Sequence, residues 1–142
     1  MYTDGGSRGN PGPAAIGVYI SASGGETLEK KYGEYIGEKT NNEAEYQALI
    51  FGLKKIKQLV GKKKTKLAEI TCYLDSELVV NQLNHKYKLQ EKNIQKLFLE
   101  IWNLMLDFKA VKIYHILREK NKIADKLVNQ ALDEKEKQGT LI

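Results

Sequence analysis

Four acidic residues stand out because their side chains could do chemistry together: Asp4, Glu45, Asp75 and Asp125. Each belongs to a different segment of the chain. Carboxylates held close together repel one another, so their convergence would require a cation. Carboxylate oxygens without a supporting cluster of Cys or His suit Mg²⁺ or Mn²⁺ better than zinc. The pattern therefore predicts a site for a hard divalent cation.

Each of these acids also has a simpler structural interpretation. Asp4 is able to cap the glycine-rich turn that follows it, and Asp75 the helix that follows it. Asp125 suits the first turn of a helix, where negative charge complements the helix dipole. Glu43 and Glu45 differ, because Glu43 falls at the third position of a capping box while Glu45 falls at the rim of an apolar stripe. The residue types alone leave these interpretations open.

The hydrophobic pattern predicts which elements position these acids. Residues 2–4, 14–20 and 28–36 read as strands, with a turn at 23–25, and a helix follows Thr40. Beyond it we expect strands at 70–74 and 111–116 and helices at 76–83, 94–108 and 124–132. This order predicts an α/β fold whose five-stranded mixed sheet carries helices on both faces. Sites in such sheets gather outside the carboxyl ends of strands.

Composition limits the class of protein. The chain has 142 residues, of which 42% are hydrophobic, so we expect one domain over residues 1–142 with a frayed tail at 134–142. The single cysteine, Cys72, excludes an intrachain disulfide and favours a reducing, cytoplasmic setting. The polar start of the chain is unlike a signal peptide, and no apolar run is long enough for a membrane span.

Basic residues form two groups, one at positions 54–66 and one at positions 86–96. With a formal net charge of +5 they favour a polyanionic partner, although lysine runs are as commonly a solvated helix face. The charge pattern leaves both readings open.

Four stretches resemble type 1 ribonuclease H: TDGGSRGNPGPAAIG, KTNNEAEYQALIFGL, YLDSELVVNQL and REKNKIADKLVNQALD. They occur in the family's order and cover nearly the whole chain. The resemblance implies a ribonuclease H-like fold and an endonuclease that cleaves the RNA strand of RNA–DNA hybrids. It also implies a two-metal mechanism that leaves 5′-phosphate and 3′-hydroxyl ends.

The resemblance also implies roles for individual residues. Asp4, Glu45, Asp75 and Asp125 match the family's metal-binding acids, for two Mg²⁺ ions with Mn²⁺ as a substitute. The resemblance further implies three kinds of contact with nucleic acid. Gly5 and Gly6 leave room for a nucleic-acid backbone, and the remaining matched positions read the minor groove (Asn10, Asn41, Asn42) or hold a DNA phosphate (Thr40, Asn93). Thr40 also fits the helix cap, so its two roles compete.

The sequence departs from the family pattern in several places. The loop before the last helix, residues 117–120, has no histidine, and Arg118 is the nearest substitute. Glu38 and Glu77 put acids where many members carry basic or neutral groups. The long basic insertion of some bacterial members is absent between Leu83 and Asn93, which leaves Lys86, Tyr87 and Lys88 as a local substitute.

Two other classes of protein are weighed against the enzyme. A nucleic-acid-binding module without catalysis would have no use for four acids. Another nuclease or strand-transfer enzyme of the same fold, such as a transposase core, would not need the TNN and GNPG stretches. We therefore expect a monomeric enzyme that acts on RNA–DNA hybrid, without a membrane or an obligate protein partner.

Overall fold

The computed structural model describes residues 1–22 and 28–140. The turn expected at residues 23–25 and the final residues 141–142 lie outside the described residues. The elements, in chain order, are β1 (Tyr2–Ser7), β2 (Gly12–Ala22), β3 (Leu28–Lys39), α1 (Asn41–Thr65), β4 (Glu69–Leu74), α2 (Glu77–Leu83), α3 (Lys92–Met105), β5 (Ala110–His115), the 3₁₀ turn η1 (Arg118–Lys120) and α4 (Lys122–Thr140).

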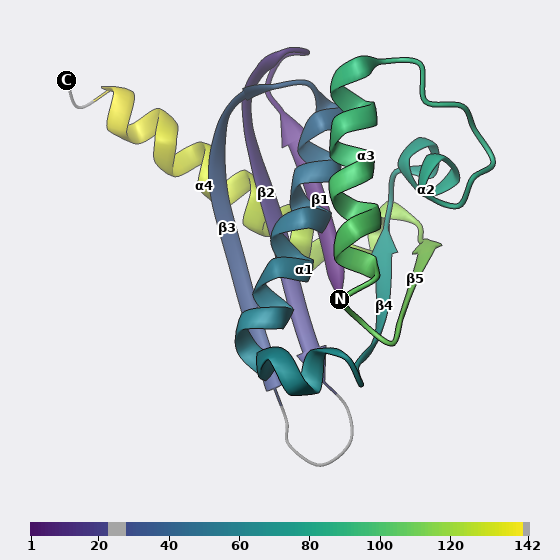
Figure 1. Cartoon of the computed structure of the whole chain (residues 1–142). Helices are drawn as coiled ribbons and strands as arrows, with labels where there is room; N and C mark the ends of the chain where they lie inside the picture. Colours follow the sequence, from purple (N-terminus) through teal and green to yellow (C-terminus); the bar gives the residue numbers. More distant parts are fainter. Residues whose placement is uncertain (23–27, 141–142) are drawn as a thin grey trace.

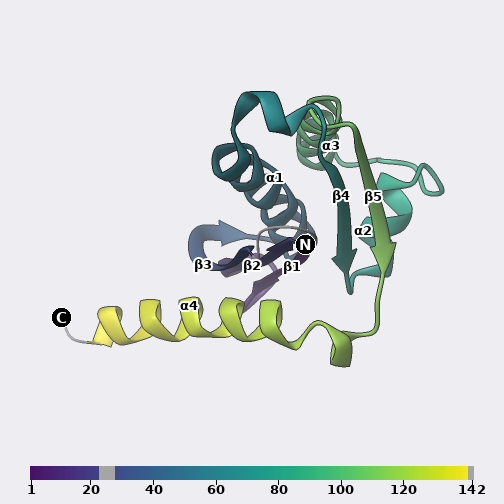
Figure 2. The same cartoon turned by 90° about the horizontal axis from the view of Figure 1, so that it is seen from below.

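The sheet has the order β3-β2-β1-β4-β5 (Figure 1). Strand β2 is antiparallel to both β1 and β3, while β4 lies parallel to both β1 and β5. Helices α1 and α3 cover one face, and α4 crosses the other (Figure 2). The predicted α/β fold, a five-stranded mixed sheet with helices on both faces, is confirmed.

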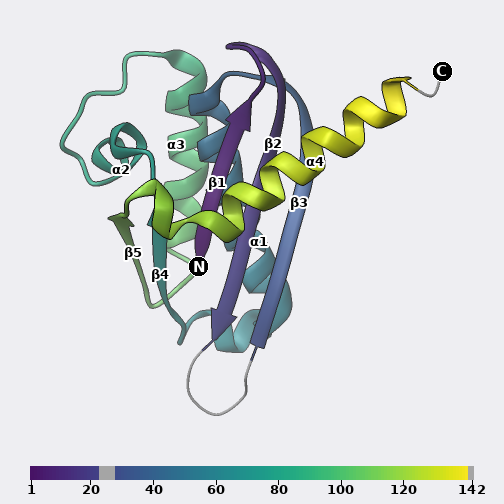
Figure 3. The same ribbon diagram turned by 180° about the vertical axis from the view of Figure 1, so that it is seen from behind.

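Most of the core lies between the sheet and the two helices α1 and α3. Its fully buried side chains include Val18 of β2, Tyr46 and Leu49 of α1, and Ile101 of α3. A smaller cluster on the opposite face joins Ala15 to Val128 and Leu132 of α4, which runs diagonally across β1, β2 and β3 (Figure 3). The two clusters fix α1 and α4 against opposite sides of β1.

Several predicted boundaries differ from the structure, and two of these concern the ends of the first strand and of the last helix. The first strand does not end at Asp4 but continues to Ser7, because Gly5 and Gly6 pair with Ile16 and Ala15 of β2. The last helix does not end at Leu132 but runs to Thr140. Among the described residues, no helix combines the length and the apolar composition that a membrane crossing requires.

Candidate functional site

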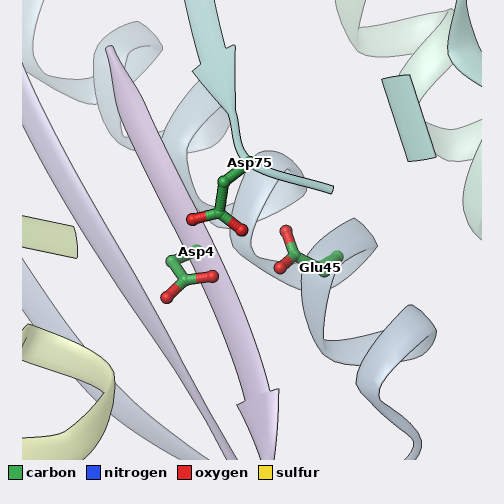
Figure 4. Close-up of side chains that lie close together, drawn as sticks. All are labelled: Asp4, Glu45 and Asp75. Carbon is green, nitrogen blue, oxygen red and sulfur yellow. The ribbon is translucent and has the colours of Figure 1, made fainter. Parts of the chain in front are cut away.

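Three of the four predicted acids converge. Asp4 comes from β1, Glu45 from α1 and Asp75 from the residue after β4, and their carboxyl groups point toward one another (Figure 4). One carboxylate oxygen from each residue lies within 4.8 Å of the others. Asp4 and Glu45 are buried, with 8% and 7% of their surface exposed, whereas Asp75 is half-buried. Three acids at this spacing form a candidate cation site.

The divergence of two parallel strands makes room for these carboxylates. The pairing of β1 with β4 is limited to Tyr2 and Tyr73, so the strands separate beyond that point. Asp4 lies two residues further along β1, and Asp75 lies two residues beyond Tyr73. Asp75 does not cap α2, because the side chain of Ser76 accepts that hydrogen bond from the backbone of Val79. Its carboxyl group therefore remains available to the site.

Glu45 reaches the site because α1 packs very closely on β1. A Cβ built on Gly5 would lie 2.2 Å from the carbonyl carbon and oxygen of Ala44. The glycine at position 5 is therefore required for helix packing, and its expected contact with a nucleic acid stays a prediction. The N-terminus of α1 is fixed by the predicted capping box, in which Thr40 Oγ1 accepts from the Glu43 backbone and Glu43 accepts from the Thr40 backbone.

Burial and mutual repulsion change the acidity of the clustered groups. Burial raises the pKa of Asp4 to about 7, helped by the charges of Asp75 and Asp125, although its hydrogen bond to Glu45 acts in the opposite direction. Burial, followed by the charge of Asp4, raises the pKa of Glu45 well above its ordinary value. Glu45 Oε2 is buried and has no hydrogen-bond partner among the described residues. An unpartnered oxygen in an acid cluster fits a cation ligand.

Asn121, which sequence reasoning did not single out, fixes the position of Asp75. Its side-chain amide donates to the Thr3 carbonyl oxygen and to Asp75 Oδ2, each at 2.9 Å. Only 1% of Asn121 is exposed. The amide thus joins β1, the end of β4 and the start of α4. Its place one turn before Asp125 was the only signal in the sequence, and that spacing does not reveal contacts with β1 and β4.

Asp125 and Arg118 lie farther out in the same pocket. The pocket has a volume of about 560 Å³, and both residues contribute to its lining. Asp125 is exposed on the first turn of α4 and lies outside the group of three close carboxylates. Arg118 is exposed on η1. The structure therefore brings together three of the expected ligands and places the fourth at the rim.

The three asparagines expected from the sequence, Asn10, Asn41 and Asn42, line this pocket together with Gly5 and Gly6, and Asn129 lines it as well. Asn41 Oδ1 accepts from the Ser7 backbone at 2.9 Å, and Asn10 Oδ1 accepts from the Asn41 backbone at 3.0 Å. Because these amide oxygens are engaged within the protein, the NH₂ groups of Asn10 and Asn41 remain as donors toward a ligand.

Thr40 and Asn93 are not among the residues that line the acid pocket. They lie together beside it, since both interact with Glu43 and lower the pKa of its carboxyl, the Thr40 backbone hydrogen bond being the larger cause. Arg8, not predicted from the sequence, also lines the pocket and pairs with two acids of α4, Asp133 at 2.7 Å and Glu136 at 2.6 Å.

Comparison with known proteins identifies relatives of the whole fold. A family model described as reverse transcriptase-like matches residues 2–131. The Ribonuclease H of Hydrogenovibrio crunogenus is 31% identical over 149 residues, which cover 94% of each chain. The bifunctional protein Rv2228c of Mycobacterium tuberculosis is 35% identical over 133 residues, and the chain spans only about a third of its length, 35%.

A solved structure shares both the fold and much of the sequence. The crystal structure of LC11 RNase H1 in complex with an RNA/DNA hybrid superposes with a TM-score of 0.85 and is 44% identical, over 94% of this chain and 95% of that one. The residues matched by the family model, 2–131, include every acid of the site. The chain belongs to the type 1 ribonuclease H family, within the group described as reverse transcriptase-like.

Proposed function

We propose that this chain is a metal-dependent endonuclease that cleaves the RNA strand of RNA–DNA hybrids. The observation that carries the proposal is the set of three carboxylates, from three elements, whose oxygens lie within 4.8 Å of one another. A related protein, LC11 RNase H1, has been solved with an RNA/DNA hybrid. Hydrolysis would break the bond between phosphorus and the 3′-oxygen and leave 5′-phosphate and 3′-hydroxyl ends.

The acids would hold the metal ions. Asp4, Glu45 and Asp75 form the close part of the site, and Asp125 at the pocket rim supplies a further carboxylate. We infer Mg²⁺, two ions with substrate bound, because the donors are all hard oxygens. Bound there, such ions lower the pKa of a water and stabilise the charge that develops during phosphodiester hydrolysis. Asn121 keeps Asp75 oriented by holding one of its two oxygens.

The asparagine donors support recognition of a hybrid. The free NH₂ groups of Asn10 and Asn41 suit acceptors only, such as 2′-hydroxyl oxygens and the base edges of a minor groove. The minor-groove acceptors differ little between A·T and T·A pairs, so such contacts tolerate many sequences. We infer that they read the shape and the 2′-hydroxyl groups of the RNA strand. Thr40 and Asn93 are proposed to hold a phosphate of the DNA strand.

The test is cleavage of an RNA–DNA hybrid with a label on the 5′ end of the RNA. With Mg²⁺ we expect cutting of the RNA strand and no cutting of duplex DNA or single-stranded DNA. Asp75→Asn should abolish cleavage, because it removes a ligand charge while Ser76 continues to cap α2. Glu77→Gln is the matched control, since Glu77 is exposed, stands two residues away and does not line the pocket.

Two results would contradict the proposal. Comparable cutting of duplex DNA would contradict the proposed specificity for hybrids. Normal cleavage by Asp75→Asn would contradict the proposed role of Asp75 as a metal ligand. A chain that binds hybrid tightly without cutting it under any divalent cation would instead support a binding module.

A further inference from the structure

A group of seven lysines lies far from the acid pocket, on the second half of α1 and just beyond it. We call it the distal lysine cluster: Lys54, Lys55, Lys57, Lys62, Lys63, Lys64 and Lys66. The ordinary explanation is a solvated surface that also complements the negative end of the helix dipole. Two features of the structure are not covered by that explanation, the shape of the helix and the distribution of acids around it.

The helix α1 is broken at Gly61, whose backbone is non-helical with φ 81° and ψ 165°. A Cβ at this glycine would meet nothing within 4 Å, so the residue is needed for its backbone conformation and not for packing. In an unbroken helix Lys57 and Lys66 would point about 180° apart, at 3.6 residues per turn. The break instead lets Lys57, Lys62 and Lys66 line one pocket.

This second pocket has a volume of about 560 Å³ and a basic lining. Its one acid, Asp107, is already paired with Lys57 at 2.6 Å. Within the described part of the chain, Lys62 and Lys66 have no acidic partner. Two uncompensated positive charges therefore face the same open space, beside the exposed side chain of Leu106 and the ring of Phe108.

The distal lysine cluster is separated from the acid pocket by most of the length of α1. Asn41 and Asn42 line the acid pocket at the N-terminus of the helix, whereas the break lies 19 residues beyond Asn42. At 1.5 Å per residue this separation is about 28 Å. Figure 1 shows α1 running the length of the sheet, so the two pockets lie toward opposite ends of the molecule. A phosphate held at the acid pocket is therefore out of reach of Lys62.

We propose that the pocket formed by Lys57, Lys62 and Lys66 is a second binding site for the phosphodiester backbone of duplex nucleic acid. Within the cluster, Lys54 is already paired with Glu100 at 2.9 Å and Lys57 with Asp107 at 2.6 Å, so the uncompensated charge of the pocket lies on Lys62 and Lys66. Two uncompensated lysines that share one open pocket suit neighbouring phosphates of a backbone, and a duplex presents such phosphates along its whole length. The site does not depend on cleavage at the acid pocket, and it would hold a duplex segment that is not being cut.

The test measures binding of a fluorescent 20-base-pair DNA duplex by anisotropy, in chelator, at several salt concentrations. Lys62→Gln/Lys66→Gln should raise Kd about three-fold or more and reduce the log–log salt slope by about two units, one for each lost phosphate contact. The control is Lys30→Gln/Lys112→Gln, which removes the same charge from exposed residues of β3 and β5. We expect the control pair to leave the salt slope unchanged.

A variant without any change in charge tests the geometry. Gly61→Ala has room for its methyl group but disfavours the positive φ, so it should turn the last lysines away from the pocket and weaken duplex binding. Circular dichroism confirms that each variant is folded. Cleavage of a short labelled hybrid, measured in parallel with Mg²⁺, should stay at the level of the parent protein for the Lys62/Lys66 pair.

Several outcomes would overturn the second site. If Lys62→Gln/Lys66→Gln leaves the Kd and the salt slope unchanged, these lysines are only solvated surface residues. The same conclusion follows if the control pair loses as much affinity for the duplex. Duplex displaced by inorganic phosphate at constant ionic strength would indicate a single-anion pocket. Folded Gly61→Ala with the affinity of the parent would show that the break does not build the site. Loss of cleavage in every variant and in the parent would count against the proposed enzyme and leave this test intact.

Discussion

At the scale of single residues, Asn121 shows how a neutral side chain can organise an acidic site. It is almost fully buried and donates to Thr3 and Asp75 from one nitrogen. Asn121→Ala would leave the Thr3 carbonyl oxygen unpaired and Asp75 free to rotate. We expect a loss of about 1–3 kcal/mol in the free energy of unfolding and a fall in kcat of about 10–100-fold, as for other residues that orient metal ligands.

Asn129→Ala is the matched control for the effect of this substitution on stability. Asn129 also donates to an aspartate, Asp125, but it is exposed. Its replacement should change stability by less than about 0.5 kcal/mol. Urea unfolding of the metal-free variants and steady-state cleavage of hybrid make the comparison. An Asn121→Ala protein as stable as Asn129→Ala and as active as the parent would contradict the positioning role.

Arg118 is a second residue whose role can be tested by kinetics. It lines the acid pocket from η1, in the loop where the family resemblance led us to expect a histidine. If it acts on product departure or on charge in the transition state, Arg118→Ala should lower kcat more than it raises KM. Lys120→Ala, on the same turn but outside the pocket lining, is the control. Unchanged turnover would make Arg118 an ordinary surface residue.

At the scale of the elements, the site depends on how closely α1 approaches β1. Gly5→Ala would place a methyl group 2.2 Å from the Ala44 carbonyl, so α1 and with it Glu45 must move away from Asp4. We expect a destabilisation of about 1–3 kcal/mol, typical of overpacking, together with weaker Mg²⁺ binding. Gly6→Ala should be tolerated, because its nearest neighbour is Val128 Cγ1 at 3.4 Å. Thermal melts with and without Mg²⁺ distinguish the two, and equal tolerance would contradict this account.

Features of the fold that depend on neighbours in the sequence were predictable, and features that depend on remote contacts were not. The capping box at Thr40 is local in sequence, and so was predicted correctly down to its two hydrogen bonds. The end of β1 was not, because glycines that resemble a turn are held in the strand by β2 and required by α1. The end of α4 was missed for a similar reason, since Arg8 pairs with Asp133 and Glu136 from far away along the chain. The contacts of Asn121 are equally remote.

At the scale of the whole molecule, the acid cluster links folding to protonation. In the folded chain, burial raises the pKa of Asp4 to about 7 and raises the pKa of Glu45 as well. In an unfolded chain carboxyls titrate near pH 4. The folded state therefore binds more protons between these values, and the stability that those protons contribute is present below about pH 4 and is lost as pH rises through 7.

Metal-free protein should accordingly lose stability as the pH is raised from 5 to 8. Asp4→Asn removes the carboxyl group whose pKa is raised to about 7. In chelator, the melting temperature of this variant should therefore fall less between pH 5 and 8 than that of the parent. Mg²⁺ competes with the bound protons, so the rise in melting temperature that it causes should be larger at pH 8 than at pH 6. If the melting temperatures of the parent and Asp4→Asn proteins depend on pH identically in chelator, the proton is held elsewhere. If the rise in melting temperature caused by Mg²⁺ shrinks as the pH rises, binding of Mg²⁺ by these carboxylates is contradicted.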